Sequence, residues 1–478
     1  MEWEVCDMRG SSTWLRRICA GGVAALGLAL LPAGVSAGAT TVISGQTTES
    51  SGLKSNYLIE VPSPWNGTLV LYSHGYSFGP PFGAPAPQTA EDAGDATTHD
   101  WLLANGYAIA GSSYATTGWA LQQAFQDQIA VLDVFESKGY HAKRTIAWGH
   151  SLGGMITAGL VQLFPKRFDG ALPMCGVVAG GPGVWNQGLD SEFAFLTLQA
   201  PGAFKLAGFT SAGDVGANYV AAITAFNTAQ STAQGRARIA LSAALADVPG
   251  WFDPTQPQPA ANDYAAQEAN QLAWDNSPDL FFGFFGRAEL EARAGGNFSW
   301  NTGVDYHAQL ANSVNRAEVE ALYTAAGLDL NKELDTLNAT PRISADPGAV
   351  AYVSKYITYN GDLDMPVLSM HTTGDGLVEV TDENAYASVV GSAGDSKLLR
   401  QVFVHRAGHC TFTPAETVTA FQTLVQRIDT NHWGSIDPST MNADATSLGT
   451  TFNSAPASFI PFQPAQFLRP FDVRNTGD

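Results

Sequence analysis

The stretch RTIAWGHSLG, residues 144–153, decides the fold of this chain. Its residues before Gly149 predict a buried strand, and the apolar run that begins at Leu152 predicts a helix. Between them, the pattern Gly-x-Ser-x-Gly predicts a strained turn that projects the Ser151 hydroxyl from the end of the strand. A chain with 49 glycines can contain this pattern by chance, so the prediction depends on its strand–turn–helix context.

Strand and helix patterns alternate on both sides of this stretch. The apolar spacing over 122–138 is that of a helix. Strands are predicted at 56–61, 68–73, 107–111, 170–175, 366–370 and 398–405. This order predicts an α/β protein with a mostly parallel central sheet and helices on both faces.

The composition divides the chain after its N-terminal segment into four parts. We expect a first core part at 38–180, a mainly helical insertion at 181–355, a second core part at 356–430 and an irregular tail at 431–478. The insertion is predicted because strand patterns nearly vanish there, whereas stretches such as 316–326 have helical spacing. The tail is rich in Pro, Ser and Asn and has no clear periodicity.

Residues 1–37 have the features of a secretory signal peptide. An arginine pair precedes an apolar run of about 14 residues, and Val35-Ser36-Ala37 is a small-residue cleavage site. The run is shorter than the ~20 residues of a membrane span, so no stable membrane anchor is expected. Acidic residues precede Met8, which favours Met8 as the true start. We expect a secreted or periplasmic protein cleaved near Ala37; the alternative is a buried N-terminal helix.

The charge of the chain argues against nucleic-acid binding. The formal net charge is −20, and the 24 Lys and Arg residues form no basic cluster. We therefore expect no nucleic-acid partner and interpret the acidity as a solubility feature. Nothing in the sequence indicates an oligomeric state.

The stretches at about 67–180 and 365–428 resemble the α/β-hydrolase superfamily, and the likeness covers roughly half of the chain. The resemblance implies a nucleophile, an acid and a histidine in that order. The acid candidate is Asp375, which follows the strand at 366–370, and the base candidate is His409. Alternatives are Glu379 for the acid and His405 for the base; Asp362 and Asp364 precede the strand and so lie at its wrong end.

The resemblance also implies two backbone donors for an oxyanion. The Leu152 N–H lies at the start of the helix after the nucleophile. The second donor is the N–H of Tyr76, because His74-Gly75-Tyr76 follows the strand at 68–73 as in lipases and esterases. By the same likeness His74 shapes the loop and has no catalytic role.

Two cysteines, Cys175 and Cys410, remain after the signal peptide. They can form one bridge in an oxidising compartment, but their spacing alone cannot pair them. In the fold that the resemblance implies, both lie at the carboxyl edge of the sheet. A Cys175–Cys410 bridge is therefore expected to pin the His409 loop to the sheet.

An aromatic run, residues 281–285, stands out in the insertion, with Trp274 and Trp300 beside it. It can line a pocket for an apolar acyl or aryl group, or it can form the core and docking face of the insertion itself.

The expected function is hydrolysis of carboxylic esters, small or polymeric, through a Ser151–His409–Asp375 triad and an acyl-enzyme intermediate. This mechanism needs no cofactor, and no metal-binding motif stands out in the sequence. A serine peptidase or amidase on the same scaffold is the alternative. A non-catalytic binding protein is a third reading, although no member of the triad is missing.

Overall fold

The computed structural model describes residues 39–49, 51–79 and 88–471. The predicted signal peptide, its cleavage site near Ala37 and the start at Met8 lie outside the described residues. Within the described ranges, no helix combines the length and the apolar character that crossing a membrane requires.

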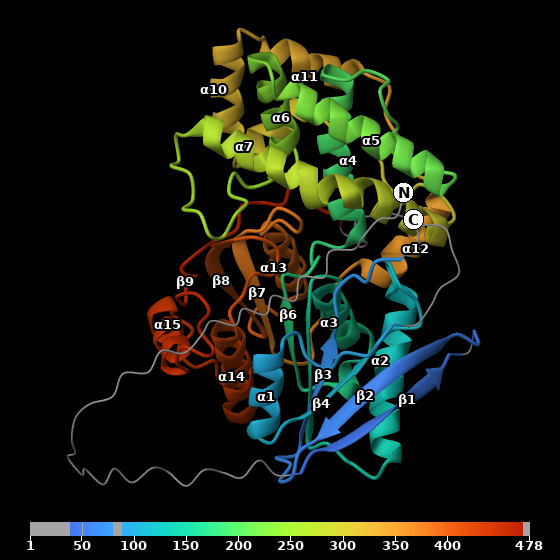
Figure 1. The fold of residues 1–478 in the computed structure, drawn as a ribbon, viewed down its shortest axis with the longest axis vertical. Helices are drawn as coiled ribbons and strands as arrows, with labels where there is room; N and C mark the ends of the chain where they lie inside the picture. Colours follow the sequence, from blue (N-terminus) through green and yellow to red (C-terminus); the bar gives the residue numbers. More distant parts are fainter. Residues whose placement is uncertain (1–38, 50, 80–87, 472–478) are drawn as a thin grey trace, which may run out of the picture. The chain divides into compact units, whose positions relative to one another are not determined.

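A single nine-stranded sheet forms the centre of the fold (Figure 1), in the order β1-β2-β4-β3-β5-β6-β7-β8-β9. The neighbouring pairs from β4 to β8 are parallel, whereas β1, β2 and β9 run antiparallel to their neighbours. This sheet confirms the predicted fold class. The strands are β1 (Thr41–Thr48), β2 (Lys54–Val61), β3 (Thr68–Ser73), β4 (Ala108–Ser112), β5 (Arg144–His150), β6 (Gly170–Met174), β7 (Val367–Gly374), β8 (Leu399–Ala407) and β9 (Phe459–Ile460).

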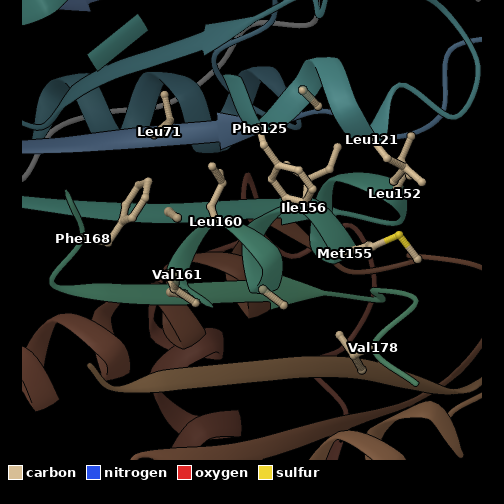
Figure 2. Close-up of a cluster of buried hydrophobic side chains, with 14 of the residues drawn as sticks. Leu71, Leu121, Phe125, Leu152, Met155, Ile156, Leu160, Val161, Phe168 and Val178 are labelled. Atoms are coloured by element: carbon tan, nitrogen blue, oxygen red, sulfur yellow. The ribbon is translucent and has the colours of Figure 1, made fainter. Parts of the chain in front are cut away.

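Helices cover both faces of the sheet. Side chains of α2 and α3 pack in one apolar cluster (Figure 2). Side chains of α13 also belong to this cluster, whereas those of α1 and α14 belong to another. The helices of the core are α1 (Ala96–Ala104), α2 (Leu121–Ser137), α3 (Leu152–Leu163), the short 3₁₀ turn Pro165–Arg167, α13 (Asp382–Ala393) and α14 (Pro414–Thr430).

Burial of strand β3 explains why its sequence is continuously apolar from Leu69 to Tyr72. All six of its residues are buried. Leu69 and Leu71 join the cluster with α2 and α3, whereas Val70 and Tyr72 join the cluster with α1 and α14. Successive side chains of a strand point to opposite faces, so a strand covered on both faces has no position for a solvated residue.

Between β6 and β7 the chain forms a helical region that we call the cap, residues 181–357. Much of it packs around a separate apolar cluster that includes Phe195, Phe226 and Phe284. Its elements are α4 (Gly181–Leu198), α5 (Ala212–Ala229), α6 (Ala233–Ala244), α7 (Tyr264–Trp274), the π-helical turns Asp275–Asp279 and Phe282–Gly286, α8 (Arg287–Ala294), α9 (Tyr306–Asn312), α10 (Arg316–Ala326), α11 (Leu330–Ala339) and α12 (Pro347–Ile357).

Side chains of the cap and of the core pack in one apolar cluster where the two regions meet. Trp185 of α4 and Val353 of α12 belong to the same apolar cluster as α2 and α3. Helix α12 also extends to residue 357, past the expected end of the insertion at 355. The two regions therefore form a continuous packed body in which the sequence boundary at 355/356 falls inside a helix.

The C-terminal part contradicts the expectation of an irregular tail at 431–478. It contains helix α15 (Pro438–Ser447) and strand β9, which pairs with the edge strand β8. Asp437 caps α15, and only Met441 and Ala445 of that helix are buried. An apolar face of two residues gives too weak a periodic signal to predict a helix. Tertiary packing against the core, which the sequence does not reveal, stabilises this segment.

Candidate active site

Ser151 occupies a strained turn between β5 and α3. Its φ of 58° and ψ of −124° lie outside the regions that ordinary residues favour. A Cβ atom at either Gly149 or Gly153 would overlap the carbonyl oxygen of Ser73. Both glycines are therefore required by close packing against the end of β3, and the turn is anchored by a 3.0 Å hydrogen bond from Ser151 N to Met174 O.

Asp375 and His409 form a hydrogen-bonded pair at the ends of β7 and β8. His409 Nδ1 lies 2.7 Å from Asp375 Oδ2. The other carboxylate oxygen accepts hydrogen bonds of 3.1 Å from the backbone N–H groups of Leu377 and Val378, and the Asp375 side chain is fully buried. This geometry fixes the carboxylate and orients Nδ1 toward it, which leaves Nε2 as the free edge of the imidazole.

The Nε2 edge of the His409 ring lies against the disulfide bridge between Cys175 and Cys410. Nε2 is 3.4 Å from Cys410 Sγ. Among the described residues, the Ser151 hydroxyl has no hydrogen-bond partner within 3.5 Å, His409 included. Nucleophile–base hydrogen bonds are often long in proteins without substrate and shorten on binding, so a reacting pair need not be hydrogen-bonded in this state.

The bridge between Cys175 and Cys410 is present and confirms the expected pairing. Cys175 directly follows β6, and Cys410 follows His409 in the loop after β8. Their Cα atoms lie 5.4 Å apart although 235 residues separate them in sequence. The covalent link thus ties the histidine loop to the strand that lies beside β5.

The loop after β3 runs beside the nucleophile, as expected for an oxyanion loop. A Cβ atom on Gly75 would lie 3.6 Å from Ser151 Cβ. Tyr76, Leu152 and Ser151 line one cavity. Leu152 is the first residue of α3, where the backbone N–H has no acceptor within the helix.

The other histidines near the site have structural surroundings. His74 stacks on the Tyr114 ring at 3.9 Å, and its Nδ1 lies 2.7 Å from the Gly75 carbonyl oxygen. Burial lowers the pKa of His74 and lowers that of His150 to about 4, which favours neutral rings. His405, the alternative base, packs against Trp251 and lies 3.4 Å from Thr373 Oγ1.

His371 is a buried partner of the acid loop that the sequence did not single out. Its Nδ1 lies 3.2 Å from Glu383 Oε1, and its Nε2 lies 2.9 Å from the Val378 carbonyl oxygen. Burial alone would lower its pKa, but Glu383 and Asp375 raise the pKa to about 9. A protonated His371 offsets the charge of these carboxylates. The signal that the sequence offered for His371 is its position, four residues before the predicted acid Asp375.

The cavity at Ser151 encloses about 950 Å³ of empty space, part of it open to solvent. One wall is aromatic, because the Tyr76 ring lies at 5.4 Å from Trp119 and 5.1 Å from Phe282. Of the aromatic run at 281–285, Phe282 lines the cavity whereas Phe284 is fully buried in the cap cluster. Both expected roles of this run are therefore found, on different residues.

A second wall of this cavity is acidic. Its carboxylates are Glu192, Asp275, Asp279 and Glu379, and its cation is Arg287. Glu379, the alternative acid, thus faces the cavity while Asp375 pairs with His409. Sequence reasoning missed this wall because three separate segments of the chain build it.

One group of side chains in the described residues has the spacing of a metal site. Ligand atoms of Glu60, Asp92 and His99 lie within 4.8 Å of one another. These residues belong to β2, to the loop before α1 and to α1, and none of them lines the cavity at Ser151.

Comparisons with known proteins place this geometry in context. Residues 105–180, which include the Ser151 turn, match the prolyl oligopeptidase family of peptidases, S9. The o-phthalyl amidase of Xanthobacter agilis is 30% identical over 436 residues, covering 83% of this chain and 90% of that protein. An esterase from Aspergillus oryzae has a TM-score of 0.44 at 14% identity, covering 82% of this chain and 80% of the other. Feruloyl esterase B from the same organism has a TM-score of 0.40 at 15% identity, with the same coverage.

Proposed function

Because this chain belongs to the α/β-hydrolase family of the o-phthalyl amidase and is a hydrolase of the serine type, we propose that Ser151, His409 and Asp375 are its catalytic triad. The observation that carries the proposal is the 2.7 Å contact between His409 Nδ1 and Asp375 Oδ2, in a loop that the Cys175–Cys410 bridge ties to the end of β6, where Met174 O accepts a hydrogen bond from Ser151 N. A buried carboxylate in this position holds the imidazole in the tautomer that can accept a proton at Nε2.

In the proposed acylation step, His409 Nε2 takes the proton of the Ser151 hydroxyl as Oγ attacks the substrate carbonyl carbon. The Leu152 and Tyr76 N–H groups stabilise the negative charge that forms on the carbonyl oxygen. His409 then gives the proton to the leaving group, and the acyl-enzyme forms. Water, deprotonated by the same imidazole, releases the acid and restores Ser151.

The first candidate substrate is a carboxylic ester, small or polymeric. An ester needs only a nucleophile, a base, an oxyanion site and room for the acyl group, and the cavity at Ser151 provides space with an aromatic wall. The second candidate bond is an amide. The specific observation in its favour is the relative named as an amidase, whose likeness extends over 90% of its length.

A matched substrate pair separates these candidates. We would measure kcat/KM for a p-nitrophenyl ester and a p-nitroanilide of the same acyl group, with the unaltered protein and with Ser151→Ala. The proposal predicts that Ser151→Ala lowers kcat for the better substrate by about 10⁴-fold or more. If kcat/KM for the anilide exceeded that for the ester by orders of magnitude, the amide would replace the ester as the proposed substrate. Undiminished hydrolysis by Ser151→Ala would reject the nucleophile.

We also propose that the protein acts outside the cytoplasm, secreted or periplasmic. The Cys175–Cys410 bridge supports this, because disulfides persist in oxidising compartments. N-terminal sequencing of the mature protein tests it, with cleavage near Ala37 as the expected result. A mature chain that begins at Met1 or Met8 would contradict the proposed signal peptide.

A further inference from the structure

Four carboxylates from three segments face the cavity at Ser151. Glu192 belongs to α4, Asp275 and Asp279 to the kinked turn that follows α7, and Glu379 to the turn between β7 and α13. Glu192 and Asp275 are 8% and 5% exposed. The backbone between these two acids leaves helical geometry at Ser277, whose φ of −167° and ψ of 117° are extended, so Asp275 and Asp279 flank a kink.

The oxygens of this acidic wall lack partners. Among the described residues, Glu192 Oε2, Asp275 Oδ2 and both carboxylate oxygens of Asp279 are shielded from solvent and accept no hydrogen bond. Buried polar atoms are nearly always paired in folded proteins, because an unpaired one costs about 1–3 kcal/mol. Several unpaired acceptors that line one cavity therefore indicate a donor that arrives from outside.

Arg287, the cation of this wall, does not supply that donor. Its guanidinium donates to Ser299 Oγ at 2.9 Å and to the Trp185 carbonyl oxygen at 3.4 Å. Its charge lies over the rings of Trp185 and Phe298, at 5.1 and 5.4 Å from their centres. In the described part of the chain, Arg287 forms no ion pair within 4.0 Å with the four carboxylates.

The spacing of the carboxylates favours an organic cation over a metal ion. Three potential ligand residues with atoms within 4.8 Å of one another occur in the described residues only at Glu60, Asp92 and His99. No three groups of the acidic wall approach so closely, so they cannot form a compact three-ligand shell around one ion. A protonated amine donates up to three hydrogen bonds in different directions and suits dispersed acceptors.

We propose that the cavity at Ser151 binds substrates with a protonated amino group, which Glu192, Asp275, Asp279 and Glu379 hold while the aromatic wall contacts the apolar body. This names the substrate class of the proposed hydrolase and rests on that proposed function. The substrate is thus an ester or amide of an amine-bearing compound with an aliphatic or aromatic body.

The charges around the acidic wall make amine binding depend on pH. Burial raises the pKa of Glu192 to about 7 and raises the pKa values of Asp275, Asp279 and Glu379 well above their ordinary range. The neighbouring charged groups that act on them are Glu268, Arg287, Asp375 and Asp382. Burial therefore favours the protonated forms of these groups, and a bound ammonium favours their charged forms, so amine binding releases protons. Amine affinity should rise between pH 6 and pH 8, because an alkylamine stays protonated throughout.

The first test compares two esters that differ only in charge. They are p-nitrophenyl 6-aminohexanoate and p-nitrophenyl heptanoate, in which a methyl group replaces the ammonium. We expect kcat/KM to be about tenfold or more higher for the amino ester at pH 8. Asp279→Asn and Glu192→Gln should reduce this ratio, whereas Glu320→Gln, the same change on the exposed surface of α10, should leave the ratio unaltered.

The second test needs no catalysis and keeps the two proposals distinguishable. Ser151→Ala protein is titrated with hexylamine and with hexan-1-ol in a calorimeter at pH 6 and pH 8. Tighter binding of the amine, with release of protons, supports the acidic wall even if the triad assignment fails. Equal binding, or a preference for the alcohol at both pH values, overturns the inference. If kcat/KM is equal for the two esters while hydrolysis still depends on Ser151, the inference of amine binding is overturned and the proposed function stands.

Discussion

At the scale of single residues, the Ser151 turn depends on the absence of two side chains. Gly149 and Gly153 both face the Ser73 carbonyl oxygen, so β3 and α3 approach each other more closely than alanine allows. The sequence predicted this turn because its glycines, its serine and its flanking apolar runs are local. It could not give the reason for each glycine, because Ser73 is nearly 80 residues away in the chain.

Gly153→Ala is expected to destabilise the protein and disturb the nucleophile. The new methyl group overlaps backbone atoms that cannot rotate away, so we expect a loss of about 1–3 kcal/mol in the free energy of unfolding. Urea denaturation measures this loss. Gly216→Ala is the matched control, because that helical glycine in α5 has open space around it and should gain up to about 1 kcal/mol. Equal stability of both variants would contradict the packing argument.

Two histidines only four residues apart in the chain should differ sharply in their importance. We expect His409→Gln to lower kcat for a neutral ester by about 10⁴-fold, because the base is lost while binding remains. His405→Gln should stay within a few fold, since His405 contacts Trp251 and Thr373 outside the Asp375 pair. Steady-state kinetics at pH 8 give both values. The reverse pattern would assign the base to His405.

At the scale of elements, the core and the helical character of the cap were largely predictable, but the packing of the cap's segments around the cavity was not. Strands such as β3 and β5 and helix α14 followed from local apolar patterns, because each is buried along most of its length. Strand β1 and the short β9 were missed. β1 is half-exposed along its length, and β9 has only two residues, so neither carries a strong pattern. The triad candidates follow strand ends, whereas the acidic wall needs the folded cap to bring its segments together.

The bridge between the β6 end and the histidine loop should contribute to stability and to catalysis. Replacing both cysteines, with Cys175→Ser and Cys410→Ser, is expected to lower the free energy of unfolding by about 2–4 kcal/mol. We also expect kcat to fall, because His409 adjoins the released end of the loop. Thermal unfolding and ester kinetics measure the two effects.

Reductant provides the control for this pair. It should lower the Tm of the unaltered protein toward that of the double variant and leave the double variant unaffected. A double variant with unaltered Tm and kcat would show that the loop is held without the bridge.

At the scale of the whole described body, the C-terminal segment connects the core to the cap. β9 pairs with the core strand β8. Nine residues after β9, Arg469 forms an ion pair with Asp190 of the cap helix α4 and donates to the Trp300 carbonyl oxygen at 3.0 Å. Asp190 is fully buried and also accepts a hydrogen bond from Tyr306. The C-terminal segment therefore links the core to the cap, whereas the sequence predicted only an irregular tail.

Arg469→Gln is expected to destabilise the fold by about 3 kcal/mol or more at pH 8, because it leaves Asp190 buried without its cation. Burial already raises the pKa of Asp190. Without Arg469 the pKa rises further, so a protonated Asp190 should make the loss smaller at pH 5. Arg316→Gln breaks an exposed pair and should change stability by at most about 1 kcal/mol. Chemical denaturation at both pH values is the measurement, and equal effects of the two variants would contradict the connection.

Covalent labelling shows most sharply whether Ser151 is an activated nucleophile. A fluorophosphonate transfers its phosphonyl group to the Oγ of such a serine with loss of fluoride, and the adduct is located by peptide mass spectrometry. Trypsin releases residues 145–166 as one peptide, in which Ser151 is the only serine. We expect a stoichiometric adduct on this peptide and none in Ser151→Ala. An adduct on another residue, or equal labelling of Ser151→Ala, would contradict this expectation.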